Sequence, residues 1–288
     1  MNFEAWVVEN ESTVRLSFFI GIFLAVALWE LLSPRRLLLL SRWLRWSNNL
    51  ALVALNTAIL RLLFPLAAVG VAATAATEGW GLLNHTDLSA EITILIAVVV
   101  MDFVIWLQHV MVHAIPLLWR LHRVHHADLD YDVTTGARFH PIEIVLSMLI
   151  KIATILLLGP PVVAVILFEV ILNAMAMFNH GNIRLPETMD RVLRTLVVTP
   201  DMHRVHHSIE EDEANTNFGF NLSCWDRLLG TYRAEPRQGQ EGMVIGVEGM
   251  NQQAKTNQLI GMLLLPFSRQ ANPFVRYTIN RRRRNREI

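Results

Sequence analysis

The stretch HVMVHAIPLLWRLHRVHH, residues 109–126, decides how the rest of the chain is interpreted. It contains an HxxxH box followed by an HxxHH box, and the second box, HRVHH, occurs again at residues 203–207. Ten of the eleven histidines of the chain lie between residues 109 and 207. These ten are His109, His113, His122, His125, His126, His140, His180, His203, His206 and His207.

The spacing within each box is typical of metal ligands on a helix. Residues i and i+4 of an α-helix lie about 40° apart around the axis, and i, i+3 and i+4 span about 100°. Each box therefore directs its imidazoles from one face. Neutral imidazole binds zinc, copper, iron and nickel ions well. Because one catalytic metal takes about three protein ligands, the whole set predicts two metal ions. We expect His85, outside the interval, to be an ordinary histidine.

The composition is that of a membrane protein. Hydrophobic residues make up 53% of the 288 residues and charged residues 17%, whereas soluble domains carry about 25% charged residues. The formal net charge of zero says little about partners, and we expect no nucleic acid among them. The single cysteine, Cys224, excludes an intrachain disulfide and a cysteine-based metal site.

Apolar runs predict about three membrane spans followed by a helical hairpin. The runs cover residues 16–32, about 50–76 and about 92–113, and a longer apolar stretch covers residues 142–178. This last stretch is interrupted by Gly159-Pro160-Pro161, which cannot continue a helix. Each of its two halves is near the lower length limit for a membrane span. The sequence therefore predicts a hairpin that enters the membrane, and leaves open whether the hairpin crosses it fully. We predict an all-α, multi-span helical bundle with a cytosolic, histidine-rich cap.

The distribution of charge predicts an orientation in the membrane. The loop at residues 34–46, the segments that carry the boxes and the C-terminal tail are rich in arginine. The N-terminus and the connector at residues 77–91 are acidic. By the positive-inside rule, the boxes and the C-terminus are expected on the cytoplasmic side and the N-terminus on the opposite side.

The boxes and the motifs around them resemble the fatty acid hydroxylase/sterol desaturase superfamily of integral-membrane di-iron enzymes. The similarity covers about residues 100–235. Besides the boxes, the matching features are Asp102, RFHPIE at 138–143, FNHGN at 178–182, TPDMH at 199–203, NFG at 217–219 and WDRLLGTY at 225–232.

The resemblance implies two iron ions, O2 as co-substrate, and attack on an unactivated C–H bond of a sterol-like or fatty acyl lipid. Hydroxylation is the expected outcome, with desaturation and ether-lipid monooxygenation as alternatives. The eight box histidines correspond to the metal ligands of the family, and His140 and His180 match its additional histidines. The implied division is N-terminal membrane helices at 1–90, a catalytic domain at 91–240, and an interfacial segment with a basic tail, Arg281 to Arg284, at 241–288.

The electrons must come from another protein. The chain has no dinucleotide fingerprint, no flavin motif and no iron–sulfur cysteine set. We therefore expect a ferredoxin, a cytochrome b5 or a reductase as the donor, with the membrane and a lipid substrate as the other partners. Breaking an alkyl C–H bond needs a redox-active metal, which zinc is not.

Carboxylates near the boxes are candidates for orienting the ligands. Asp102 lies about 10 Å along a helix from His109, too far for a hydrogen bond. It is expected either to orient a histidine of another helix or to be a structural partner of an arginine or tryptophan. Arg123 and Arg204, inside the HRVHH boxes, are expected either to pair with carboxylates or to face headgroups and water. The candidate partners are Glu143, Asp201 and Asp226.

Two other classes of protein compete with the oxygenase interpretation. A membrane zinc hydrolase needs a general-base glutamate beside its ligands, as in HExxH, and no box contains one. A histidine-rich metal carrier predicts ligands along membrane-crossing helices, whereas most boxes lie outside the apolar runs. The sequence identifies no catalytic residue beyond the metal ligands.

Overall fold

The structure is a computed structural model that describes residues 3–250 and 256–268. Over these residues it consists of helices and loops with three isolated β-bridges and no β-strand. The helices are α1 (Phe3–Glu9), α2 (Glu11–Leu32), α3 (Arg42–Leu63), α4 (Ala67–Glu78), η1 (Leu82–His85), α5 (Ala90–Ala114), α6 (Pro116–His126), η2 (Thr135–Ala137), α7 (Pro141–Leu158), α8 (Val162–Asn179), α9 (Glu187–Leu193), α10 (Pro200–His206), α11 (Glu211–Ala214), α12 (Cys224–Leu228), α13 (Gly239–Gly242), α15 (Leu259–Leu264) and η3 (Leu265–Phe267).

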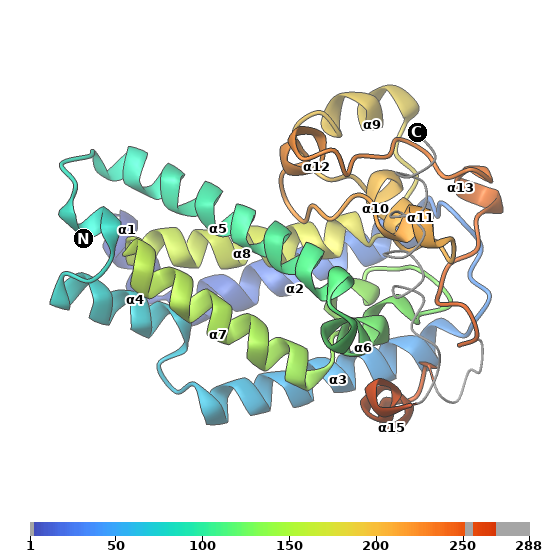
Figure 1. Ribbon diagram of the computed structural model, residues 1–288, viewed down its shortest axis with the longest axis horizontal. Coiled ribbons are helices and arrows are strands. Elements are labelled where there is room, and N and C mark those ends of the chain that lie inside the picture. Colours follow the sequence, from blue (N-terminus) through green and yellow to red (C-terminus); the bar gives the residue numbers. More distant parts are fainter. Residues whose placement is uncertain (1–2, 251–255, 269–288) are drawn as a thin grey trace, which may run out of the picture.

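Long helices form a bundle along the longest axis of the molecule (Figure 1). Helix α8 contacts both α2 and α5, and α7 contacts α3 and α4. Five helical segments are long and apolar enough to cross a membrane, which confirms the predicted multi-span, all-α fold. They are Glu11–Leu32, Arg42–His85, Ala90–Ala114, Pro141–Leu158 and Val162–Asn179.

Prolines and a glycine set the breaks between the long helices. Helix α3 ends at Leu63, two residues before Pro65, because proline lacks the N–H that a helix interior requires. The second apolar run is therefore two helices. Helix α7 ends at Leu158, and its C-cap Gly159 has a φ of 66°, in the left-handed region that favours glycine. Helix α8 starts directly after Pro161, so the predicted hairpin is confirmed.

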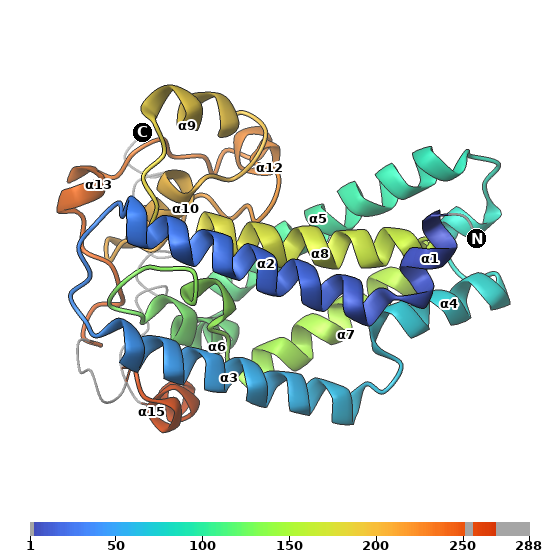
Figure 2. The same cartoon turned by 180° about the vertical axis from the view of Figure 1, so that it is seen from behind.

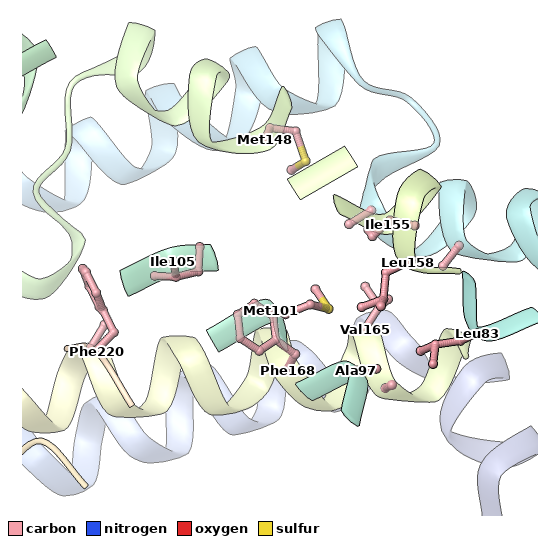
Figure 3. Packing of buried hydrophobic residues seen from close by; sticks show 14 residues of the cluster. Leu83, Ala97, Met101, Ile105, Met148, Ile155, Leu158, Val165, Phe168 and Phe220 are labelled. Carbon is pink, nitrogen blue, oxygen red and sulfur yellow. The ribbon is translucent and has the colours of Figure 1, made fainter. Parts of the chain in front are cut away.

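The interior of the bundle is an apolar core supplied mainly by α4, α5, α7 and α8 (Figure 3). Ala97 and Met101 of α5 and Phe168 of α8 are almost completely buried in it. Phe220 belongs to the same core but comes from the loop before α12. Its ring centroid lies 4.9 Å from that of His109, so the core extends to the histidines.

The histidine-bearing segments gather at one end of the bundle (Figures 1 and 2). We call residues 115–140, 180–250 and 256–268 the cap. In the cap, α15 and η3 pack on α6 and α3, where Met262 contacts the core around Leu52 and Trp119. Ile260 and Phe267 are exposed on the same segment, and its predicted place in the membrane interface stays a prediction. The basic run Arg281 to Arg284 lies outside the described residues.

Candidate metal centre

Nine of the ten predicted histidines form two groups of side chains that could each hold a metal ion. Within each group, one nitrogen of every ring lies within 4.8 Å of the others. All nine side chains are at most 2% exposed. We call the first group, His109, His113, His122, His126 and His206, group one, and the second, His125, His180, His203 and His207, group two.

The helices divide the boxes between the two groups. The HxxxH box on α5 lies entirely in group one. The box on α6 gives its i and i+4 histidines to group one and the remaining histidine, His125, to group two. The box on α10 divides in the opposite way, with His206 in group one and His203 and His207 in group two. The groups are adjacent, since the His126 and His207 rings stack with centroids 4.5 Å apart.

Hydrogen bonds at Nδ1 fix the tautomer of several rings. The Nδ1 atom donates to a backbone carbonyl in His109 (to Phe218, 2.7 Å) and in His206 (to Thr216, 2.7 Å). His180 donates in the same way to the carbonyl of Ala176 at 2.8 Å. Because a carbonyl oxygen only accepts, Nδ1 carries the hydrogen and Nε2 keeps its lone pair.

In three pairs of histidines, the two Nε2 atoms face each other at short range. They lie 3.2 Å apart in the pair of His109 and His122, and 3.1 Å apart in the pair of His113 and His126. In group two, Nε2 of His180 lies 3.2 Å from Nε2 of His125. Two metal–nitrogen bonds of about 2.0–2.1 Å at tetrahedral or octahedral angles place the nitrogens about 2.8–3.4 Å apart. The observed spacing therefore fits two ligands of one ion.

Other buried ring nitrogens lack hydrogen-bond partners among the described residues. They include both nitrogens of His203 and of His207, and Nε2 of His206. A buried polar atom without a partner costs free energy unless something else satisfies it. A metal ion would satisfy these atoms, and all-imidazole donors suit zinc, copper, iron or nickel.

Burial keeps six rings of the cap neutral. It lowers the pKa of His180 to about 3 and lowers the pKa of five further cap histidines well below the ordinary value near 6.5, with further lowering by neighbouring imidazoles. A neutral ring is the form that binds a metal. The rings so affected are His125, His126, His203, His206 and His207.

The tenth predicted histidine, His140, lies outside both groups. It is the N-cap of α7, where its Nδ1 accepts from the backbone N–H of Ile142 at 3.2 Å. Its Nε2 lies 3.3 Å from the carbonyl oxygen of Leu263. The structure therefore gives His140 a role as a helix cap that contacts α15.

Asp102 is the structural partner of a tryptophan. Its carboxylate accepts from Nε1 of Trp225 at 2.7 Å and from the backbone N–H of Leu222 at 3.3 Å. Among the described residues it has no hydrogen bond with a histidine. Of the two expectations for Asp102, the structure therefore agrees with a structural partnership with a tryptophan, because α12 and the loop before it supply its partners.

Asp226 supports a ligand through the backbone. It accepts from the N–H groups of Phe218 and Gly219, each at 2.9 Å, and from Nε1 of Trp106 at 3.0 Å. The carbonyl of this same Phe218 accepts from His109. Asp226 thus fixes the turn that holds a group-one ring.

The two arginines of the HRVHH boxes have different kinds of hydrogen-bond partner. Arg204 pairs with Asp201, as one of the two expectations stated. Arg123 donates instead to the carbonyl oxygen of Leu265 at 2.6 Å and to Ser268, and it has no carboxylate partner among the described residues. Neither expectation for Arg123 holds, because its side chain is buried and η3 packs against α6 and supplies the carbonyl oxygens to which it donates.

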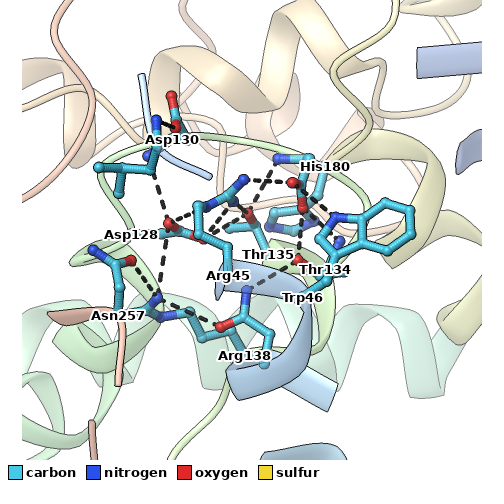
Figure 4. A network of polar contacts seen from close by, with 12 residues as sticks. Arg45, Trp46, Asp128, Asp130, Thr134, Thr135, Arg138, His180 and Asn257 are labelled. Carbon is cyan, nitrogen blue, oxygen red and sulfur yellow. Dashed lines mark hydrogen bonds and ion pairs between the residues drawn. The ribbon is translucent and has the colours of Figure 1, made fainter. Parts of the chain in front are cut away.

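A buried ionic network lies beside the histidines (Figure 4). It was not predicted from the sequence. Arg45 of α3 pairs with Asp128 at 2.7 Å and with Asp132, and all three side chains are fully buried. Burial opposes the ionisation of Asp128, but Arg45 and Arg138 outweigh it and hold its pKa at about 2. The network fixes the loop that follows His126. Its signal in the sequence is the alternation of aspartates in DLDYD at residues 128–132.

Comparison with known proteins agrees with this site. The family model for fatty acid hydroxylases matches residues 94–231. Ornithine lipid hydroxylase OlsE of Rhizobium tropici is 30% identical over 176 residues, which are 61% of this chain and 50% of that protein. Human alkylglycerol monooxygenase is 28% identical over 139 residues, 46% of this chain and 29% of that protein. Rat cholesterol 25-hydroxylase is 24% identical over 145 residues, 50% and 47% respectively.

The matched segment lies in a helical bundle with five candidate membrane spans, and the relatives that it matches are named as lipid hydroxylases and monooxygenases. Residues 94–231 match the fatty acid hydroxylase family model, and the resemblance predicted from the boxes is confirmed. The chain spans at most half the length of these three relatives. No solved structure matches it significantly.

Proposed function

We propose that the protein is a membrane-bound, di-iron, O2-dependent oxidoreductase that hydroxylates a C–H bond of a lipid. The observation that carries this proposal is the pair of adjacent, buried, all-imidazole groups in a fatty acid hydroxylase domain. Two such groups within one cap suit a centre of two ions. The nine histidines of groups one and two are the proposed ligands, and His140 is left out because it caps α7.

Iron is the metal that the proposed reaction requires. Two iron ions in these groups would supply the redox chemistry that O2 activation and attack on an unactivated C–H bond need. The residues of the chain would hold neutral imidazoles in fixed tautomers and exclude water. Phe139, whose ring stacks on His125 with centroids 4.5 Å apart, and Phe218 contribute to that exclusion.

The proposed substrate is a lipid that reaches the histidines from the bundle. The side of the groups that faces the bundle is apolar, since Phe220 contacts both His109 and His203 and belongs to the bundle core. The relatives are named for ornithine lipid, alkylglycerol and cholesterol, so lipids of these classes are the first to test. Desaturation and ether-lipid cleavage are the alternative outcomes of the same oxidation.

The electron donor and the orientation are further parts of the proposal. A ferredoxin, cytochrome b5 or reductase would deliver electrons to the cap from the cytoplasm. The loop between α2 and α3 and the first turn of α3 support this orientation, because they carry Arg35, Arg36, Arg42 and Arg45 and lie at the cap end of the bundle (Figure 1).

The test uses the full chain purified in detergent from iron-replete cells. Metal content is measured first, and about two irons per chain are expected. The protein is then supplied with a reductant, oxygen-18-labelled O2 and each lipid class, and the products are analysed by mass spectrometry. Incorporation of label into a lipid by the wild type, and none by the variants His125→Ala and His206→Ala, supports hydroxylation. Iron-loaded protein that reduces O2 but labels no lipid of these classes contradicts it.

A further inference from the structure

A cavity of about 150 Å³ lies between the loop that joins α2 to α3 and the end of the cap. Arg36 and Leu38 line it on one side, and Met243 and Ile245 on another. A single water needs on the order of 10–15 Å³ by this measure, so the cavity accommodates a polyatomic group. Tyr131 is also part of the wall.

The cavity is separate from the metal centre. The ring of Tyr131 lies between them, with its centroid 5.4 Å from that of His180 and 5.0 Å from that of His207. The hydroxyl of Tyr131 donates to the carbonyl of Asn179 at 2.6 Å, which holds the ring in this position. Neither group one nor group two contributes a residue to the wall.

Arg36 is the charged donor of the cavity, and it lacks a partner. Its Nη1 atom is buried without a hydrogen-bond partner, and the guanidinium forms no salt bridge with the described residues. Asp130, also in the wall, accepts from the backbone N–H groups of residues 39 and 40. Burial lowers the pKa of Arg36 and the charges of Arg204 and Arg35 lower it further, while the charges of Asp130 and Glu241 offset only part of this lowering. A bound anion would counter both effects.

The arginines around Arg36 already have carboxylate partners. Asp201 pairs with both Arg35 and Arg204. Glu241 pairs with Arg35 at 2.8 Å and with Arg184 at 3.0 Å. Three guanidinium groups therefore share two nearby acids, and a third acid, Asp130 in the cavity wall, is held by backbone N–H groups. With Arg36, four guanidinium groups lie near three carboxylates. This leaves a local excess of positive charge at the cavity.

The position of the loop favours a membrane lipid as the source of the anion. Helix α2 and helix α3 are both candidate spans, so the loop between them lies at a bilayer surface, where headgroups are found. Leu37 is 89% exposed and Leu39 is 81% exposed beside the buried Nη1 atom. Exposed leucines next to a half-buried guanidinium match a molecule with acyl chains and an anionic headgroup.

We propose that this cavity binds the anionic headgroup of a membrane lipid. Arg36 donates to a phosphate or carboxylate oxygen of the headgroup, and Leu37 and Leu39 lie along its acyl chains. This site does not depend on the oxidation proposed above, and its occupancy is measured without turnover.

The test is isothermal titration calorimetry of the full chain in detergent with dihexanoylphosphatidylglycerol. Arg36→Gln is expected to weaken binding at least about tenfold, because a charge-assisted hydrogen bond is lost. Leu38→Phe, which keeps the charge but fills the cavity, is expected to weaken binding as well. The matched control is Arg191→Gln, since Arg191 is an exposed cap arginine paired with Glu187, and it is expected to bind like the wild type.

Two further probes separate the possible ligands. Dihexanoylglycerol has the same chains without the charge, and equal affinity for it overturns the headgroup assignment. Inorganic phosphate that displaces the phospholipid with a similar dissociation constant overturns the assignment of a lipid as the ligand. Unchanged phospholipid binding by both Arg36→Gln and Leu38→Phe, each with wild-type circular dichroism, overturns the site itself.

Discussion

The Nδ1 atom of His122 lies 2.6 Å from Oε1 of Glu143, which joins α6 to the first turn of α7. This contact leaves Nε2 of His122 to face Nε2 of His109. Pro141 at the start of α7 brings Glu143 to this position, because proline at the first helical turn fixes where the helix begins. The short motif HPIE thus supplies both a helix start and an anchor for a group-one ring.

Removal of that anchor should weaken metal binding at group one. Glu143→Ala is expected to lower metal affinity about 10–100-fold, the range for loss of a carboxylate that orients a histidine ligand. Chelator competition measures the affinity. The matched control, Glu187→Ala, removes an exposed glutamate of α9 and should leave the affinity unchanged. Equal metal retention by the two variants contradicts the role of Glu143.

Loss of one ligand from each group should remove one ion at a time. His206→Ala, in group one, and His125→Ala, in group two, are each expected to lower the metal content from about two ions per chain to about one. Elemental analysis of membrane-extracted protein gives the count, with His85→Ala as the control. Wild-type metal content in both variants excludes the two groups as the metal centre.

His140 should behave differently from the nine grouped histidines. His140→Ala is expected to leave the metal content at its wild-type value and to destabilise the protein by about 0.5–2 kcal/mol, because an N-cap of α7 is lost. His140→Asn, which keeps a capping side chain, should recover most of that stability. Thermal unfolding and elemental analysis test this together, and loss of an ion in the asparagine variant would make His140 a ligand.

The metal-free protein should lose stability in mild acid. Cap histidines such as His203 and His207 have lowered pKa values, and that of His180 is about 3, whereas an unfolded chain protonates them near pH 6.5. Below about pH 6.5 the unfolded state therefore binds more protons, and the free energy of unfolding falls. Between about pH 7 and 8 these residues should have little effect. Melting temperatures of apoprotein that rise from about pH 7 to pH 5 contradict this expectation.

The buried network on α3 should be sensitive to loss of its arginine. Arg45→Met leaves Asp128 and Asp132 buried without their main partner and is expected to destabilise the protein by about 3–5 kcal/mol. Chemical denaturation in detergent measures the loss. Arg191→Met, on an exposed ion pair, should cost less than about 1 kcal/mol. A similar loss in both variants would mean that the network contributes no more than a surface pair.

The sequence predicts the elements of the fold well because local signals set them. Gly159-Pro160-Pro161 predicts the hairpin turn, and the hydropathy of each apolar run predicts a long helix. The boxes predict a histidine site because i, i+3 and i+4 spacing is a property of one helix. The sequence also held a signal for His140 as a helix cap, since this residue directly precedes a proline at the first position of a helix. The division of the chain at residues 90 and 240 stays a prediction.

Pairings between distant segments could not be predicted in this way. The assignment of His125 to group two and of His122 to group one depends on how α6 crosses α5 and α10. The partner of Asp102 is 123 residues away at Trp225. Arg45 and Asp128 are 83 residues apart. Such contacts are set by tertiary packing, and residue type alone leaves several partners possible.

The junction between α5 and α6 also limits where residues can be inserted or the chain reconnected in engineered variants. The pairs His109–His122 and His113–His126 both join residues 13 positions apart. One residue inserted at the extended Ile115 would shift α6 relative to α5 by up to about 3.5 Å and would misalign both pairs at once. A fluorescent tag or a length change is better accommodated at residues 86–89, which are exposed at the opposite end of the bundle. Circular permutants and chimaeras of this chain should therefore keep residues 109–126 as one uninterrupted unit.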